Sequence, residues 1–168
     1  MSRERARHEA RLLLGRERLV APAFTFRIEN NVAAAACTIG PALEQRVAEL
    51  FRSGERLLAL ELDALGNERL FCLAKRALAA IERETKRRGQ RLGDERYPGD
   101  PGMGLEEQPR ILELADAASK GIHSTPGGML LPVKSMSFLV PLGTTLRKSS
   151  GGPCNRCPSR ARCASRRR

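Results

Sequence analysis

Three cysteines near the end of the chain could do metal or redox chemistry: Cys154, Cys157 and Cys163. Two residues separate the first pair, so a tight turn lets both thiolates hold one metal, and five more residues return the third thiolate to the same centre. Neighbouring arginines would lower the thiolate pKa values and offset the charge of a cluster. The spacing therefore predicts a zinc site or an iron-sulfur cluster. A redox pair, or plain thiols in a basic tail, are the alternatives.

Three thiolates leave a tetrahedral metal site one ligand short. Cys37 lies in an expected strand and Cys72 on an expected helix, and each is expected to be a small buried hydrophobic residue rather than the fourth ligand. His8, a water molecule or a bound partner are the other candidates. An iron-sulfur cluster would suit electron donation and zinc a structural clasp, so the ligand pattern leaves both metals open.

The net charge of +11 belongs mainly to the C-terminal segment. Of the 30 lysines and arginines, eight lie in residues 147–168, where no acidic residue occurs, so 22 basic residues meet 19 acidic ones in the rest of the chain. A basic segment attracts phosphates or an acidic partner, or is simply solvated. A small nucleic-acid-binding protein with a zinc-knuckle-like tail is therefore an alternative. One tyrosine, no tryptophan and no aromatic residue among the tail cysteines argue against base stacking, so nucleic acid is not the expected partner.

Length and composition predict a single globular domain with a short extension at each end. A chain of 168 residues with 41% hydrophobic residues can bury a core of its own. The expected organisation is a charged N-terminal helix or extension in residues 1–20, a globular domain in 21–146 and a basic, cysteine-rich tail in 147–168. The sequence has no run of about 18 apolar residues and no signal-peptide core at its N-terminus, which predicts a cytoplasmic protein without a membrane partner.

Hydrophobic periodicity predicts two strands and two helices in the first half of the globular region. Alternating aromatic and polar residues indicate a half-buried strand at 24–28, and the small-residue run 32–39 follows a turn as an expected central strand. Helical spacing then continues through residues 41–53 and, in a longer helix that ends at a glycine cap, through 58–89. Gly66 interrupts the longer pattern, which indicates close packing or a bend there.

The second half combines turns with shorter elements. Residues 94–104 contain two Pro-Gly pairs three residues apart, and they predict a loop through which no helix or strand passes. A helix is expected over residues 105–119. The apolar runs GMLLPV and MSFLVPL, at 128–133 and 136–142, then predict a β-hairpin.

Three segments, in this order, resemble one known family. They are TIGPALEQRVAELFRSGERLLALELDALG, DERYPGDPGMGLEEQPRILELAD and GIHSTPGGMLLPVKSMSFLVPLG, and together they span residues 38–143. Their order and spacing resemble the reactivation domain of cobalamin-dependent methionine synthase and its stand-alone relatives encoded with corrinoid methyltransferases. The resemblance implies an α/β (α+β) fold, in which a bent antiparallel sheet is flanked by helices in a helmet shape.

The resemblance also implies a function. It implies that the chain helps return an oxidised cobalt(II) corrinoid to the methylated state, with an electron donor protein and S-adenosylmethionine as the methyl source. The sequence has no cobalamin-ligating motif, so a partner, a corrinoid-binding methyltransferase protein, would supply the corrinoid. Reductive activation of such a system is the expected function, and whether the chain is an enzyme or an activator that works only in complex stays open. A docking adaptor that binds no small molecule is the other alternative.

The loop with the two Pro-Gly pairs corresponds to the family's S-adenosylmethionine loop. The family usually has Arg, two residues, then Pro-Gly-Tyr. Here Arg96 precedes Pro98, Gly99 and Asp100 or, at the second pair, Gly102, so the tyrosine is missing at either alignment. The guanidinium of Arg96 could hold the methionyl carboxylate through a charge-assisted hydrogen bond, and the glycines would let the backbone approach the ligand closely. Asp100 would accept hydrogen bonds from the ribose or, as is common in turns, bond its own backbone.

A second candidate segment comprises His123, Ser124, Thr125, Lys134 and Ser135. The resemblance places them at a Leu-Thr-Glu-Ser loop and a following Pro-x-x-Ser turn near the ligand, although the glutamate is absent here. His123 could contact the corrinoid or donate a proton, because imidazole titrates near neutral pH. A solvated loop histidine is the alternative. The expected ligands are thus S-adenosylmethionine, a partner's corrinoid and, at the tail, zinc or an iron-sulfur cluster.

Overall fold

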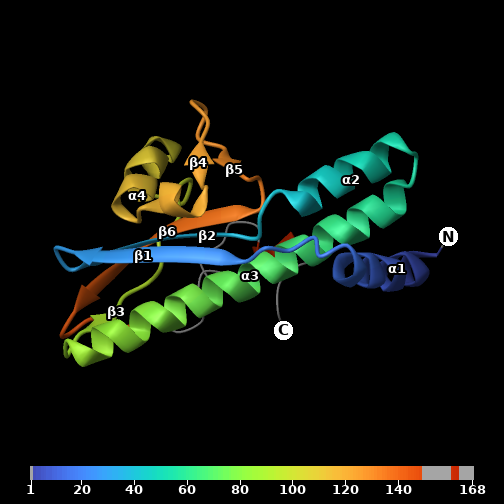
Figure 1. Ribbon diagram of the computed structural model, residues 1–168. Coiled ribbons are helices and arrows are strands. Elements are labelled where there is room, and N and C mark those ends of the chain that lie inside the picture. Colours follow the sequence, from blue (N-terminus) through green and yellow to red (C-terminus); the bar gives the residue numbers. More distant parts are fainter. Residues whose placement is uncertain (1, 149–159, 163–168) are drawn as a thin grey trace.

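The computed structural model describes residues 2–148 and 160–162, and this part of the chain folds around a four-stranded sheet (Figure 1). The strands are β1 (Ala23–Glu29), β2 (Val32–Thr38), β6 (Ser135–Gly143) and the short β3 (Arg91–Leu92), in the order β1-β2-β6-β3. Each neighbouring pair is antiparallel. Helices cover both faces, so the chain has the expected α+β fold, with an antiparallel sheet flanked by helices.

Two asparagines and a run of alanines set the first hairpin. Asn30 and Asn31, between β1 and β2, have φ values of 47° and 61°. These are the left-handed conformations that a two-residue hairpin turn requires and that asparagine tolerates. The alanines at 33–36 are buried on both faces of β2, so helices can approach this central strand closely from each side. Both predicted strands in this region are confirmed.

One face of the sheet packs against α3 (Arg56–Arg87), a helix of 32 residues. Two shorter helices, α1 (Arg3–Arg16) and α2 (Ala42–Arg52), pack against the first half of α3. At Gly66 of α3, a β-carbon would lie 2.9 Å from Leu43 Cδ2 on α2, so the predicted close packing is confirmed. No helix in residues 2–148 or 160–162 is both long and apolar enough to cross a membrane.

The long helix is capped at Gly89, as predicted. Gly89 has a φ of 67° and donates its N–H to the Lys86 carbonyl at 3.1 Å, and Gln90 donates to the Thr85 carbonyl at 3.0 Å. These two bonds form the Schellman arrangement that closes many helices. The chain then enters β3, which the sequence did not predict because two residues carry no periodicity.

The opposite face is covered by a thinner layer around α4 (Gln108–Leu114). The 3-10 turns of the described residues lie at Leu105–Glu107, Ala117–Lys120 and Arg160–Arg162, and the first two flank α4. The prediction of one helix over 105–119 was wrong, because Asp116 has a left-handed φ of 54° and breaks the helical path. Gln108 donates a hydrogen bond to Ser137 Oγ and so ties α4 to β6.

The predicted hairpin between the runs 128–133 and 136–142 was also wrong. The first run contains β5 (Leu130–Leu131), which pairs with β4 (His123–Ser124) in a separate two-stranded sheet. The second run belongs to β6, which is enclosed between α3 and α4. A strand covered on both faces needs a long partner in the main sheet. β2 is that partner, whereas β5 has only two residues.

Candidate functional site

The loop predicted to bind S-adenosylmethionine is held against β6. Arg96 exchanges two backbone hydrogen bonds with Leu139, each 2.9 Å long. Beyond it, the Asp100 N–H donates to the Tyr97 carbonyl and the Met103 N–H donates to the Asp100 carbonyl, both at 2.9 Å. The loop is therefore a pair of successive turns anchored at one end to the sheet.

Glycines let this loop meet the turn between β4 and β5. Gly99 has a φ of 92° and Gly128 a φ of 82°, both in the left-handed region. A β-carbon on Gly99 would lie 3.6 Å from Leu105 Cδ2, and one on Gly128 would lie 3.5 Å from Leu105 Cβ. Leu105 thus lies between the two turns. The structure brings together two predicted segments that are far apart in the sequence.

The β4–β5 turn carries three of the predicted residues. His123 and Ser124 form β4, opposite β5. Thr125 closes the turn, since its Oγ1 accepts the Met129 N–H at 3.1 Å and its own N–H donates to the Met129 carbonyl at 2.8 Å. The His123 side chain is exposed, and within the described residues no side chain bonds to it.

An open hollow of about 620 Å³ lies beside the first loop. Its lining is rich in glycine and acidic residues: Gly99, Asp100, Gly102, Met103, Gly104, Glu106 and Glu107. Glu106 folds across Gly104, where a β-carbon would lie 2.1 Å from both carboxylate oxygens. The three carboxylates favour a positively charged group in this hollow.

Arg96 is the cation of the same loop. Its side chain is exposed and pairs with no residue in the part of the chain that the structure describes. Asp100 Oδ2 accepts the Tyr97 N–H at 3.2 Å, so this carboxylate bonds its own backbone, the alternative given above. Tyr97 packs on Phe138 with ring centroids 5.7 Å apart, and burial raises the pKa of its phenol. Pro98, the next residue, is half-buried. The anchoring role of Tyr97 was not predicted, although it is the single tyrosine of the chain and stands beside a turn.

The side chains of Lys134 and Ser135 are engaged away from the two loops. Lys134 is 8% exposed, and its Nζ lies 2.7 Å from Asp63 Oδ1 and 2.6 Å from Asn67 Oδ1 on α3. Ser135 Oγ donates to the Pro132 carbonyl at 2.6 Å. These contacts fasten the start of β6, so a ligand at either side chain would have to displace them.

Exposed hydrophobic side chains lie along the second turn and beside it. The apolar rim consists of Leu105, Met129, Leu131 and Val133, each between 41% and 55% exposed. Its last three members are the exposed hydrophobic residues of the segment 129–133, while Leu130 packs inward on the α4 layer. The sequence signal for the rim is the apolar run 128–133, which was interpreted as one strand of the predicted hairpin. Such a rim is suited to contact with an apolar partner.

The cysteines predicted to bind a metal, Cys154, Cys157 and Cys163, lie outside the described residues. Cys37 is fully buried in β2, and burial raises the pKa of its thiol to about 12, in keeping with its expected role as a small hydrophobic residue. Cys72 is exposed on α3, so the prediction that it is buried was wrong. Within residues 2–148 and 160–162, no three histidine, cysteine, aspartate or glutamate side chains gather to hold a metal.

No protein-family model matches the chain, and no curated protein is significantly similar to it. Membership of the chain in the family that residues 38–143 resemble is therefore a proposal. It rests on the order of the three sequence segments and on the two turns that meet at Leu105.

Proposed function

We propose that the chain reactivates the corrinoid of a partner methyltransferase by holding S-adenosylmethionine against the oxidised cofactor that the partner carries. The observation that carries this proposal is the meeting of two glycine turns at Leu105. Both turns belong to segments that resemble the methionine synthase activation domain, and they lie beside an acidic hollow and the apolar rim. The bent, helmet-shaped sheet of that family is the finer fold expected here, and an antiparallel sheet between helices is consistent with it.

The first loop offers groups that complement S-adenosylmethionine. The exposed guanidinium of Arg96 suits the methionyl carboxylate. The carboxylates of Asp100, Glu106 and Glu107 line the hollow and suit the sulfonium and amino groups. Tyr97 is packed on Phe138 and does not replace the missing family tyrosine, so contacts with the adenosine would come from the loop backbone.

The apolar rim suits a corrinoid presented by a partner protein. One electron converts cobalt(II) to cobalt(I), and the electron pair of cobalt(I) takes the methyl group as the carbon–sulfur bond of S-adenosylmethionine breaks. S-adenosylhomocysteine leaves, and the methylated corrinoid holds cobalt(III). The task of this chain is to position the methyl donor over the cobalt. His123, exposed on the same hairpin as the rim, is the candidate contact to the corrinoid.

The tail cysteines would pass on the electron if they hold an iron-sulfur cluster. Cys154, Cys157 and Cys163 provide three thiolates, a donor set that suits either such a cluster or zinc. Anaerobic purification, metal analysis and an absorbance spectrum distinguish the two. An electron relay would be indicated by iron, sulfide and a reducible absorbance band at about 400 nm. All three should be lost in a Cys154→Ser and Cys157→Ser double variant. Zinc would indicate a structural clasp and place the electron source on a partner.

Isothermal titration calorimetry with S-adenosylmethionine tests the proposed site. We expect the wild-type chain to bind the ligand and Arg96→Ala to raise the Kd by about tenfold or more, because a charge-assisted hydrogen bond is lost. Arg52→Ala is the matched control, since Arg52 is also an exposed arginine without a described partner but lies at the end of α2. Absence of binding to the wild type, or an equal loss in both variants, would contradict the site.

The chemistry is tested in an anaerobic mixture of the chain, cob(II)alamin, titanium(III) citrate and S-adenosylmethionine. We expect the absorbance spectrum of methylcobalamin to develop faster with the wild-type chain than with Arg96→Ala or without protein. A non-catalytic docking adaptor is the second candidate, and two observations favour it: the missing tyrosine and the use of Asp100 in its own turn. It predicts neither S-adenosylmethionine binding nor methylcobalamin formation.

A further inference from the structure

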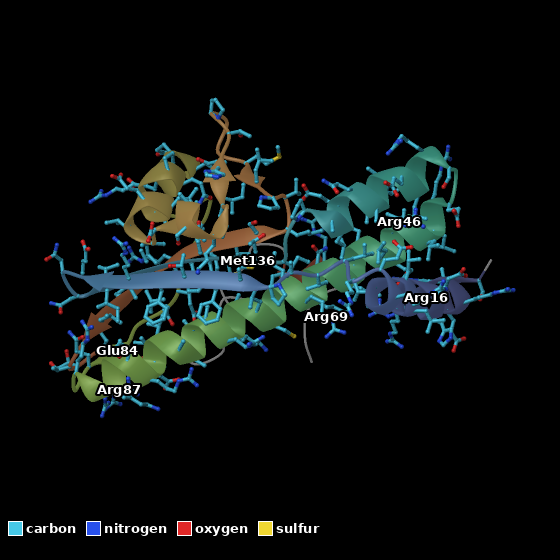
Figure 2. All side chains as sticks on the ribbon, viewed as in Figure 1. Arg16, Arg46, Arg69, Glu84, Arg87 and Met136 are labelled. Carbon is cyan, nitrogen blue, oxygen red and sulfur yellow. The ribbon has the colours of Figure 1, made fainter. Side chains whose placement is uncertain are left out.

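A recess of about 510 Å³ lies between α1 and α3. Its lining includes four arginines, Arg11, Arg18, Arg69 and Arg76, together with apolar residues such as Leu14 and Leu73. We refer to this recess as the arginine groove. Figure 2 labels Arg69 on the stretch of α3 near the end of α1. Arg18 has a left-handed φ of 49°, which turns the chain out of α1 and into the segment that closes one side of the groove.

The arginines at the two ends of the interface between α1 and α3 differ in whether they form ion pairs. Near the start of α1, Arg3 Nε lies 2.7 Å from the Glu61 carboxylate and an Arg7 nitrogen lies 3.1 Å from it, and Arg7 also pairs with Glu68. From Arg11 onward the pairing stops. The lining of the groove contains no acidic residue, and its four arginines form no ion pair with any residue that the structure describes. Like charges around one recess repel one another, so the groove favours an anionic occupant.

We propose that the arginine groove binds an acidic, partly aliphatic segment of a partner protein. Guanidinium groups match carboxylates in planar, often bidentate pairs. Arg69 and Arg76 are seven residues apart on α3, which is about 10 Å along the helix axis, so they can hold two carboxylates on one segment. Beside the arginines, the half-buried Val20 and the exposed Pro22 offer apolar surface that aliphatic side chains of the same segment would cover.

The lining distinguishes this occupant from a nucleic acid. Single-stranded nucleic acids gain affinity by stacking bases on aromatic side chains. The groove has no aromatic residue in its lining, and phosphates would leave its apolar surface uncovered. A peptide with carboxylates and aliphatic side chains satisfies both parts of the lining at once.

Docking in the arginine groove does not depend on the proposed function. In Figure 1, α1 and α3 lie on one side of the sheet and α4, β4 and β5 lie on the other. A segment bound in the groove therefore leaves the S-adenosylmethionine loop and the apolar rim open. Failure of either proposal leaves the other standing.

Fluorescence anisotropy with a labelled synthetic peptide of alternating glutamate and leucine tests the charge requirement. We expect an Arg69→Glu and Arg76→Glu double variant to bind this peptide at least about tenfold more weakly than the wild type. An Arg52→Glu and Arg83→Glu variant makes the same change in net charge with exposed arginines outside the groove, and its affinity should change by less than about twofold. Far-UV circular dichroism checks that both variants fold. An equal loss in both variants would overturn the proposal.

Protection of Cys72 locates the bound peptide on the wild-type chain. Cys72 is exposed in the lining of the groove, and trypsin releases it in the fragment 70–75, apart from all other cysteines. Mass spectrometry should show slower iodoacetamide alkylation of this fragment with the glutamate peptide and unchanged alkylation with a peptide in which glutamine replaces glutamate. Absence of protection would overturn the proposal. So would displacement of the glutamate peptide by a polyuridine RNA at a lower concentration than by unlabelled peptide, since the groove would then be a phosphate site.

Discussion

The two faces of the sheet are covered by buried clusters that differ in size and composition. On the α3 face, Phe138, Val140 and Leu142 of β6 belong to a large cluster of long aliphatic side chains from three helices. On the α4 face, the buried cluster of the described residues is small and consists mostly of alanines: Ala34, Ala36, Leu112, Ala115, Ala117 and Ile122. More apolar surface is buried on the α3 face, so that face contributes more hydrophobic free energy. The β4–β5 turn, one of the two segments proposed to bind ligand, lies on the thinner side, where local opening costs less.

Truncation on the α3 face should have the largest effect of the changes considered. Phe138 is 1% exposed, and Phe138→Ala is expected to lower the free energy of unfolding by about 3–5 kcal/mol through lost burial and a cavity. Leu112→Ala on the α4 face should cost less, about 2–3 kcal/mol, because a thin layer can collapse into the space. Urea denaturation followed by circular dichroism measures both. A larger loss in Leu112→Ala would overturn the comparison.

An ion pair between α1 and α3 should make the α3 side sensitive to pH. Glu61 is 3% exposed, and hydrogen bonds from Arg3 and then Arg7 hold the pKa of its carboxyl below the usual value. Because the folded-state pKa is lowered, the stabilisation is present above the unfolded-state pKa of about 4.3 and is lost as the pH falls through the folded-state pKa.

Glu61→Gln should therefore lower the free energy of unfolding by about 1–3 kcal/mol near neutral pH, where charged hydrogen bonds are lost. The difference from wild type should shrink as the pH falls below the folded-state pKa. Urea denaturation at a neutral and at an acidic pH measures the change. Glu84→Gln is the control, because Glu84 pairs only with the exposed Arg87 and Arg88 at the end of α3, and its effect should be too small to measure. A loss that is the same at both pH values would contradict the role of Glu61.

Sequence periodicity predicted the α3 face better than the α4 face, and packing explains the difference. The helices at 41–53 and 58–89 bury aliphatic side chains at regular spacing, so the pattern reports the packing directly. On the α4 face, the helix break at Asp116 depends on one backbone φ, and β5 consists of two residues. Neither leaves a periodic trace in the sequence.

Only part of the candidate site was predicted, because local sequence patterns indicate turns but not contacts between distant residues. The Pro-Gly pairs located the first loop, because those residues punctuate the chain wherever they occur. The contact of both turns with Leu105, and the bonds of Lys134 to α3, join residues far apart in the sequence, and no local pattern encodes them. Cys72 was misplaced because it lies between Leu70 and Leu73, two inward positions of the same helix.

A substitution in the β4–β5 turn should affect the thin side alone. Gly128 has a φ of 82°, which costs a non-glycine residue about 1–2 kcal/mol, so Gly128→Ala should loosen the turn. Hydrogen exchange should become faster for the amides of β4 and β5 and stay unchanged for those between β2 and β6. Gly127→Ala is the matched control, because Gly127 does not need a left-handed conformation and its β-carbon would come no closer than 3.9 Å to the Thr125 hydroxyl. Faster exchange throughout the sheet would show that the two faces are not independent.

The smallest expected effect concerns two helical glycines and tests how tightly the α3 side is packed. Alanine in place of glycine inside a helix gains about 1 kcal/mol, and at Gly15 of α1 no atom lies within 4 Å of the added carbon, so Gly15→Ala should stabilise the chain. At Gly66 the added carbon meets both terminal carbons of Leu43, at 2.9 and 3.1 Å, and overpacking of this kind costs about 1–3 kcal/mol. Gly66→Ala should therefore be destabilising by about 1 kcal/mol in urea denaturation. If it stabilises the chain as much as Gly15→Ala does, Leu43 moves aside freely, and the contact between α2 and α3 is not the tight one that these distances indicate.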